Sequence, residues 1–248
     1  MTHYICEDER QYIGWGGQKW TTLDALRETH KNVFYAEEPG LLGIGTTPSF
    51  AIGQRSLLVQ TPGGNILWDC ITLLDEATVQ IVRALGGIRA IGISHPHYYS
   101  SMVEWAHAFD APIYLHEASR KWVMRPDDAV QYWAGDALDL GDGVTLVRLG
   151  GHFTGGTVLH WAGGADGRGA VLSGDILAVA SDRRYVSFMY SFPNYIPLPA
   201  SEVRRIREAI EPYTFDRIYG AWWGRVVHTD AKEAVRRSAD RYIRAIAG

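Results

Sequence analysis

The sequence contains little cysteine, no surplus of positive charge and no long apolar run. Only Cys6 and Cys70 occur among its 248 residues, and two cysteines cannot build the disulfide framework of a small secreted domain. No stretch approaches the roughly 18 apolar residues that span a bilayer, and the polar N-terminus lacks a signal-type apolar segment. We therefore expect a cytoplasmic protein that does not enter membranes.

The charge balance also limits the classes of partner that we expect. Lys and Arg number 24 against 28 Asp and Glu, which gives a net charge of −4. Proteins that bind nucleic acid usually carry a basic surplus, so we expect no nucleic-acid partner. Hydrophobic residues make up 46% of the chain, an ordinary globular composition. A small-molecule substrate is the expected partner, and the sequence leaves open whether the chain forms a homo-oligomer.

The order of apolar segments, turns and helical patterns predicts the architecture. Residues 1–47 read as an irregular arm packed on a core, and residues 48–248 as the main domain. In this domain a predicted hairpin with its turn at residues 62–65 is followed by a helix over 73–85, a strand over 88–93 and a helix over 102–109. The second half has strands over 144–149, 157–161, 170–172 and 215–220. It also has two predicted helices. One begins at Ser201, a plausible N-cap, and the other begins near Asp230. This pattern predicts an α/β fold in which helices flank two mixed β-sheets.

Polar residues that can bind metals come directly after several predicted strands. They are Asp69, His95 with His97, His152, Asp175 and His228. Loops at strand ends are where α/β folds place functional groups. Chance could supply one such position, whereas five in one chain are difficult to assign to packing.

Each position also has a structural interpretation of its own. The spacing of His95 and His97 lets two imidazoles of an extended segment reach one ion, and Pro96 stiffens the link, although a lone His-x-His is more often a surface pair. His152 lies between glycines and could belong to an ordinary turn. Asp175 could simply cap the next segment, and His228 could simply flank the final helix. The helix dipole at that position favours a neutral imidazole, which also suits a metal ligand. Cys70 reads as a small buried hydrophobe.

Together these residues resemble the metallo-β-lactamase superfamily. The resemblance covers roughly residues 48–248 and rests on Asp69, His95-Pro96-His97, Gly-His152, Gly-Asp175 and His228 in the family's order. It implies the αββα sandwich, with His95, His97 and His152 as ligands of a first metal site. It also implies that Asp175 bridges two sites and that His228 belongs to the second.

The sequence departs from the family's His-x-His-x-Asp-His pattern. Tyr99 stands at the aspartate position and Ser100 at the position of the last histidine. A neutral phenol and a hydroxyl are poor zinc ligands. Asp175 and His228 are too few for a second four-coordinate site. We therefore expect one ion, zinc in the first place and Fe²⁺ as the alternative.

The resemblance favours a metal-dependent hydrolase of a small organic ester, thioester, lactone or amide that uses metal-bound hydroxide. In this hypothesis Asp175 ligates the ion or orients water, His228 assists proton transfer, and Tyr99 donates to the developing oxyanion. Aromatic residues between Tyr185 and Tyr195 suggest an apolar or aromatic substrate. One alternative is a non-catalytic binding protein, favoured because Tyr99 and Ser100 replace two of the family's metal ligands. The other is a mononuclear non-haem iron oxygenase.

Overall fold

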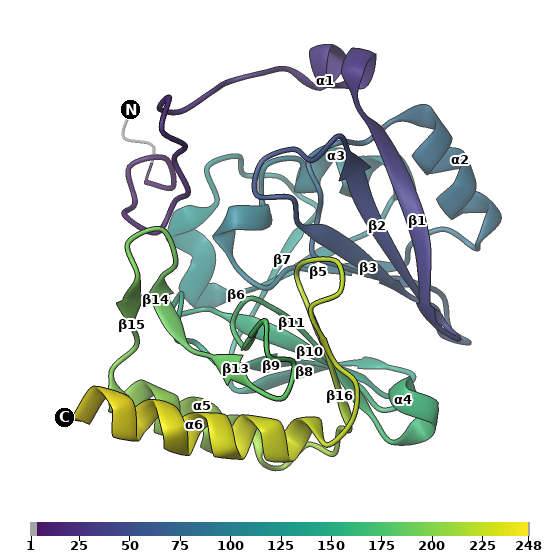
Figure 1. Cartoon of the computed structure of the whole chain (residues 1–248). Coiled ribbons are helices and arrows are strands. Elements are labelled where there is room, and N and C mark those ends of the chain that lie inside the picture. The colour runs from purple at the N-terminus through teal and green to yellow at the C-terminus, as the bar shows by residue number, and fades with distance from the viewer. Residues whose placement is uncertain (1–3, 248) are drawn as a thin grey trace.

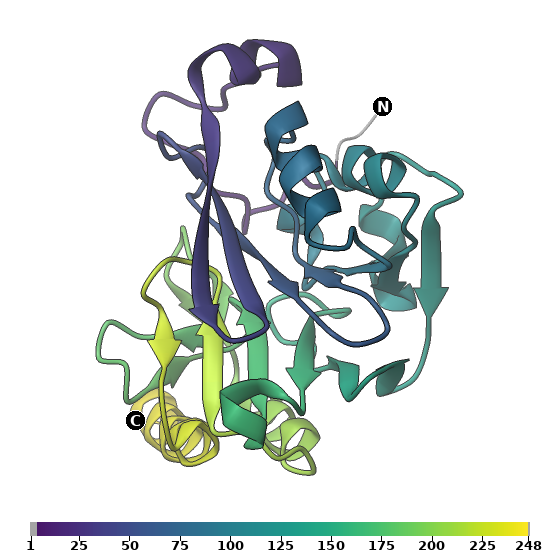
Figure 2. The same ribbon diagram turned by 90° about the vertical axis from the view of Figure 1, so that its right-hand side faces the viewer.

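Two large sheets face each other in the computed structural model, which describes residues 4–247 (Figure 1). Helices α2 (Glu76–Ala84) and α3 (Met102–Phe109) cover the outer face of the first sheet. Helices α5 (Ala200–Ile210) and α6 (Ala231–Ala247) cover the second, as Figure 2 shows from the side. This arrangement confirms the αββα sandwich of two mixed sheets.

The first sheet follows the order of the chain from β1 to β7. Strands β1 to β4 form an antiparallel meander, and β4 to β7 run parallel. Parallel neighbours need crossover connections, which α2, α3 and the 3-10 turn η2 (Glu117–Trp122) supply. The strands are β1 Lys31–Glu38, β2 Leu41–Thr47, β3 Arg55–Val59, β4 Ile66–Trp68, β5 Ala90–Gly92, β6 Ile113–His116 and β7 Val130–Trp133.

The second sheet has the order β17-β16-β11-β10-β9-β8. All its neighbours are antiparallel except β11 and β16. Two small hairpins, β12 with β13 and β14 with β15, lie in the connection between β11 and α5. The strands are β8 Ala137–Gly141, β9 Val144–Arg148, β10 Thr157–Trp161, β11 Ala170–Gly174, β12 Ala178–Val179, β13 Val186–Ser187, β14 Met189–Ser191, β15 Ile196–Pro197, β16 Arg217–Gly220 and β17 Val226–Val227.

The N-terminal region differs from the irregular arm expected over residues 1–47. Its first part, residues 4–22, does consist of turns and leads into the short helix α1 (Leu23–Thr29). Residues 31–38 and 41–47, however, are β1 and β2, which pair with each other and with β3. The sheet therefore begins before residue 48. Residues 1–3 and 248 lie outside the described part of the chain.

Two smaller expectations also need correction. Ser201 does not cap α5, because this helix begins at Ala200 after Pro199 and has no side-chain cap bond. Strands β7 and β8 were not expected from the sequence, because their short segments show little apolar character. None of the described helices has the length and apolar character needed to cross a bilayer.

Apolar side chains from both sheets fill the space between them. Fully burying one such side chain contributes roughly 1.5–3 kcal/mol, so this layer holds the two sheets, and the loops at their ends, in fixed relative positions. The large side chains in this layer include Leu57, Val59, Trp68, Leu146, Trp161, Leu172 and Tyr219.

Candidate metal centre

The candidate ligands project from loops at one end of the sandwich. Asp69 follows β4, and His95 and His97 follow β5, which is parallel to β4. His152 follows β9 and Asp175 follows β11 in the second sheet. The packing of the two sheets therefore brings together residues that are 106 positions apart in sequence, from Asp69 to Asp175.

His95 and His97 lie on a tight turn. His95 has extended backbone angles, and Pro96–Tyr98 form the 3-10 turn η1. The extended segment expected here is therefore wrong, although the imidazoles still converge. Nε2 of His95 lies 3.2 Å from Nδ1 of His97.

His152 lies in a compact loop whose backbone only glycine accommodates. Gly151 has φ +79°, and a Cβ there would approach Ile206 to 2.8 Å. The carbonyl of Tyr190 lies 2.7 Å from Nδ1 of His152. Because a carbonyl can only accept, this nitrogen carries the proton. The lone pair of Nε2 is therefore available for a metal ion.

Asp69 and Asp175 are two buried carboxyl groups with different roles. The Ser94 amide donates to Oδ1 of Asp69 at 2.7 Å, which ties the end of β4 to the loop after β5. Burial raises the pKa of Asp69 to about 7. Burial and the charge of Asp69 raise the pKa of Asp175 to about 8. Oδ1 of Asp175 lies 3.4 Å from Nε2 of His95.

The donor atoms suit one divalent cation. One nitrogen from each of His95, His97 and His152 lies within 4.8 Å of the other two, a separation that metal–ligand bonds of about 2 Å bridge after small side-chain movements. Nε2 of His152 and Oδ1 of Asp175 are buried and have no hydrogen-bond partner within residues 4–247. Buried polar groups are rarely left unpaired, so these atoms fit a metal ion.

The protonation states agree with this fit, because metal ligation requires neutral imidazoles. Burial, followed by the charges of His152 and Arg10, lowers the pKa of His97 to about 3. Burial also lowers the pKa of His152 to about 4 and that of His95 well below its usual range. All three rings are therefore neutral at pH 7.

The three residues after His97 make different contacts. Burial raises the pKa of Tyr99, so its hydroxyl keeps its proton at neutral pH, and its role as a donor to an oxyanion stays a prediction. Tyr98 contacts one of the ligands: its ring lies 4.6 Å from that of His95, and its side chain is fully buried. Ser100 is exposed and bonds Thr72 at 3.1 Å.

His228 is not part of the site. It follows β17, which runs antiparallel to β16, and its carbonyl accepts from Nε of Arg217 at 3.1 Å. Arg217 is opposite Ala170, the first residue of β11, whereas Asp175 follows the last residue of this strand. The exposed His228 therefore lies at the other end of the sheet, and the roles expected for it in metal binding and proton transfer are wrong.

Of two further groups near the histidines, Arg10 was not predicted from the sequence, whereas Phe192 lies in the aromatic segment 185–195 that was expected near the substrate. Nη1 of Arg10 donates to the carbonyl of His152 at 2.8 Å, so the N-terminal segment reaches the site. The ring of Phe192 lies 5.4 Å from that of His152. The Asp8-Glu9-Arg10 sequence carries no signal for such a contact, because it depends on a pairing across 142 residues.

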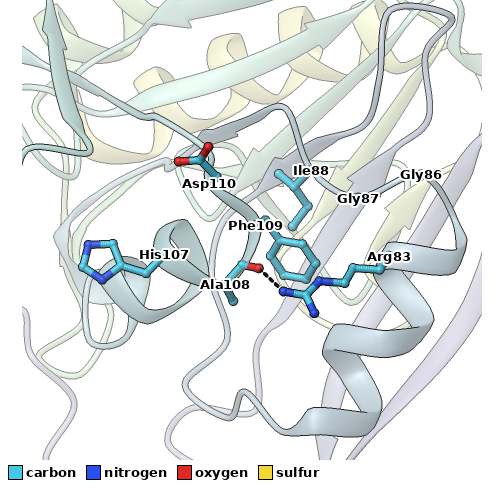
Figure 3. A pocket seen from close by; sticks show the side chains of 8 residues that line it. All are labelled: Arg83, Gly86, Gly87, Ile88, His107, Ala108, Phe109 and Asp110. Atoms are coloured by element: carbon cyan, nitrogen blue, oxygen red, sulfur yellow. Dashed lines mark hydrogen bonds between the residues drawn. The ribbon is translucent and has the colours of Figure 1, made fainter.

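A separate surface depression of about 390 Å³ lies at the opposite end of β5 (Figure 3). Ile88, just before this strand, and Phe109 line it, and Arg83 donates to the carbonyl of Ala108 across it. His107 points away from Arg83 in this view. No second set of ligands gathers around this depression among the described residues.

Comparisons with solved structures show the same fold. The metallo-β-lactamase DIM-1 superposes with a TM-score of 0.66 at 13% identity, over 87% of this chain and 98% of its own. A metallo-β-lactamase of Cronobacter sakazakii with a HARLDQ motif gives a TM-score of 0.56 at 18% identity, over 90% of this chain and 96% of its own. A metallo-β-lactamase family protein from Thermus thermophilus gives a TM-score of 0.56 at 15% identity, over 86% of this chain and 81% of its own.

Sequence comparison identifies a much nearer relative. No family model matches the chain. YmaE of Bacillus subtilis (strain 168), described as an uncharacterized protein, is 54% identical over 244 residues, which cover 98% of this chain and 89% of YmaE. The chain therefore belongs to the same family as YmaE and has the metallo-β-lactamase fold.

Proposed function

We propose that the protein is a metal-dependent hydrolase of a small organic ester, thioester, lactone or amide. The observation that supports this function is the buried convergence of three neutral imidazoles and the Asp175 carboxyl group. His95, His97 and His152 would hold the ion. A bound zinc ion would polarise a substrate carbonyl and lower the pKa of water to about 7.

Asp175 is the residue best placed to handle a proton. Its Oδ1 faces His95 with no hydrogen bond from any described residue. Its pKa of about 8 lies close to neutral pH, where a proton carrier is most effective. Asp175 would therefore either complete the ligand set or orient and deprotonate the attacking water.

One ion suits the site better than two. Of the groups needed for a second ion, Ser100 is bonded to Thr72 and His228 lies at the far end of the second sheet. Within residues 4–247 the three histidines are the one cluster of three or more metal-binding side chains. These contacts favour a mononuclear centre.

Aromatic residues beside the ligands favour an apolar or aromatic substrate. Phe192 contacts the His152 ring, and Tyr190 provides the carbonyl that holds its Nδ1. Such surfaces gain binding free energy by covering apolar parts of a ligand.

The test compares His152→Ala with His228→Ala as a matched control. Metal content is measured by elemental analysis of protein purified without added metal, and turnover on a panel of esters, thioesters, lactones and amides. We expect His152→Ala to lose the ion and turnover and His228→Ala to keep both. Wild-type metal content and turnover in His152→Ala would remove the proposal.

A mononuclear iron enzyme is the second candidate, because histidines with one carboxylate also suit Fe²⁺. The same elemental analysis separates the two: iron together with substrate-dependent oxygen consumption favours this candidate, and zinc with hydrolysis favours the first. A wild-type protein that takes up neither ion would favour the non-catalytic binding protein.

A further inference from the structure

Residues 8–10 lie against the histidine cluster although they precede it by 85 positions. The side chain of Arg10 is only 10% exposed. Its Nη1 donates to the His152 carbonyl at 2.8 Å, and its guanidinium carbon lies 3.9 Å from the centre of the Phe153 ring. Figure 1 shows this purple segment beside the β14–β15 hairpin.

Phe153 links Arg10 to all three candidate ligands. Its ring centre lies 5.5 Å from that of His95, 5.1 Å from that of His97 and 4.9 Å from that of His152. Trp122 and Tyr190 lie 5.2 and 5.0 Å from the same guanidinium. The negative faces of aromatic rings attract a cation, most strongly when the cation is desolvated, so Arg10 has a well-defined position beside the ligands.

The segment also fixes the imidazole of His152 indirectly. The Glu9 carbonyl accepts from Oγ of Ser191 at 3.0 Å and from Nδ2 of Asn194 at 2.5 Å. The adjacent Tyr190 carbonyl accepts from Nδ1 of His152. His152 is thus held through its backbone by Arg10 and through its ring by the hairpin to which Glu9 is bonded.

Asp8 orients the guanidinium of Arg10 without joining the segment to the core. Both of its carboxylate oxygens accept from Arg10 at 2.6 Å. The same local pair recurs between Asp182 and Arg184, at 2.9 and 2.7 Å. There the arginine side chain is 75% exposed, far more than that of Arg10. The contacts that distinguish Arg10 are therefore those to His152 and Phe153.

We propose that Arg10 is a positioning residue for the metal ligand His152, and that docking of residues 8–10 completes the metal centre. This inference rests on the proposed metal site. Groups that orient metal-binding histidines from outside the ligand set typically change metal affinity by about 10–100-fold when they are removed.

The test uses Co²⁺ as the probe and Arg10→Met, which keeps the length of the side chain but removes its charge and donors. Affinity is measured by chelator competition and coordination by the visible absorption spectrum. We expect at least tenfold weaker binding and an altered spectrum. Arg10→Lys should recover part of the affinity, and Arg184→Met, the matched control, should equal the wild type.

A second variant tests the same segment without changing a buried side chain. Asn194 is exposed, so Asn194→Ala removes a tie to Glu9 with little risk to the core, and it should also weaken Co²⁺ binding. In the metal-free protein, ¹⁵N spectra should show the His152 ring in its Nδ1-protonated form and a mixture of forms in Arg10→Met. Wild-type affinity and spectra in both variants would overturn the inference while the metal site stands. A wild type that fails to bind Co²⁺ would overturn both.

Discussion

Gly174 and Ser94 meet where the two sheets bring their ligand loops together. A Cβ atom on Gly174 would lie 2.6 Å from Oγ and 2.9 Å from Cβ of Ser94. Ser94 precedes His95 and Gly174 precedes Asp175, so this contact sets the 3.4 Å separation between the two ligands. Gly174 also has φ +55°, a conformation that side chains disfavour.

Gly174→Ala should therefore damage both stability and metal binding. The added methyl group must push β11 away from the loop after β5, which we expect to cost about 1–3 kcal/mol in the free energy of unfolding. Affinity for Co²⁺ should fall about tenfold, in the range seen when ligand support is lost. Urea unfolding and chelator competition measure the two effects.

Gly167→Ala is the control for backbone strain alone. Gly167 has φ +81°, and a Cβ there would meet nothing within 4 Å. This variant should lose some stability and keep its metal affinity. Equal losses of affinity in the two variants would show that the Ser94 contact does not set the ligand spacing.

Metal binding should release a proton from Asp175. Its pKa of about 8 means that the carboxyl group is mostly protonated at pH 7 and must ionise to ligate a cation. His97 and His152, with pKa values of about 3 and 4, are already neutral and release none. Calorimetry at pH 7 in buffers of different ionisation enthalpy should give about one more proton per ion for the wild type than for Asp175→Asn, and this difference should fall toward zero at pH 9. Asp175→Asn should lower the proton count, and an unchanged count would assign the proton to another group.

The metal-free protein should be most stable near pH 6.5. The pKa values of His97 and His152 are lowered from 6.5 by burial, so their contribution is complete above pH 6.5 and is lost as the pH falls toward 4. The pKa values of Asp69 and Asp175 are raised from 3.8, so their contribution is fully present below pH 3.8 and is lost as the pH rises from there toward 8. Because burial also lowers the pKa of His95, three imidazoles outweigh two carboxyl groups below pH 6.5. Urea unfolding at pH 5, 6.5 and 8.5 measures the free energy of unfolding on both sides of this maximum. A stability that still rises between pH 6.5 and 8.5 would contradict the raised carboxyl pKa values.

The positions of most ligands could be predicted because the signal is local. His95 and Asp175 each follow a short, buried apolar strand, and the strand itself is visible in the sequence. His228 also follows a strand, but β17 runs antiparallel to β16 and carries it to the opposite end of the sheet. Strand direction depends on pairing with distant segments, which the local sequence does not encode.

The same limit explains why β1 and β2 were not expected. Gly43 and Gly45 give β2 weak strand character, yet a Cβ at either position would lie within 2.8 Å of the Trp223 ring. The glycines are thus required by a contact across almost 180 residues. Arg10 is a similar case, because its position is determined by His152 and Phe153 rather than by its neighbours in the sequence.

Tyr98→Phe should leave the metal-free protein at least as stable as the wild type. The Tyr98 hydroxyl is buried and finds no hydrogen-bond partner among the described residues, and burial with the charges of Asp175 and Asp69 raises its pKa. An unpaired buried hydroxyl costs about 1–3 kcal/mol, so removing it should raise the free energy of unfolding or leave it unchanged.

Tyr219→Phe provides the comparison for this hydroxyl. Tyr219 is also buried, but its hydroxyl accepts from Nη1 of Arg217 at 3.3 Å. Loss of this bond should cost about 1 kcal/mol in urea unfolding. A similar loss in Tyr98→Phe would mean that its hydroxyl has a bonding partner in solution. If Tyr98→Phe also lowered Co²⁺ affinity, that partner would be the ion or one of its ligands, because the Tyr98 ring lies directly against His95.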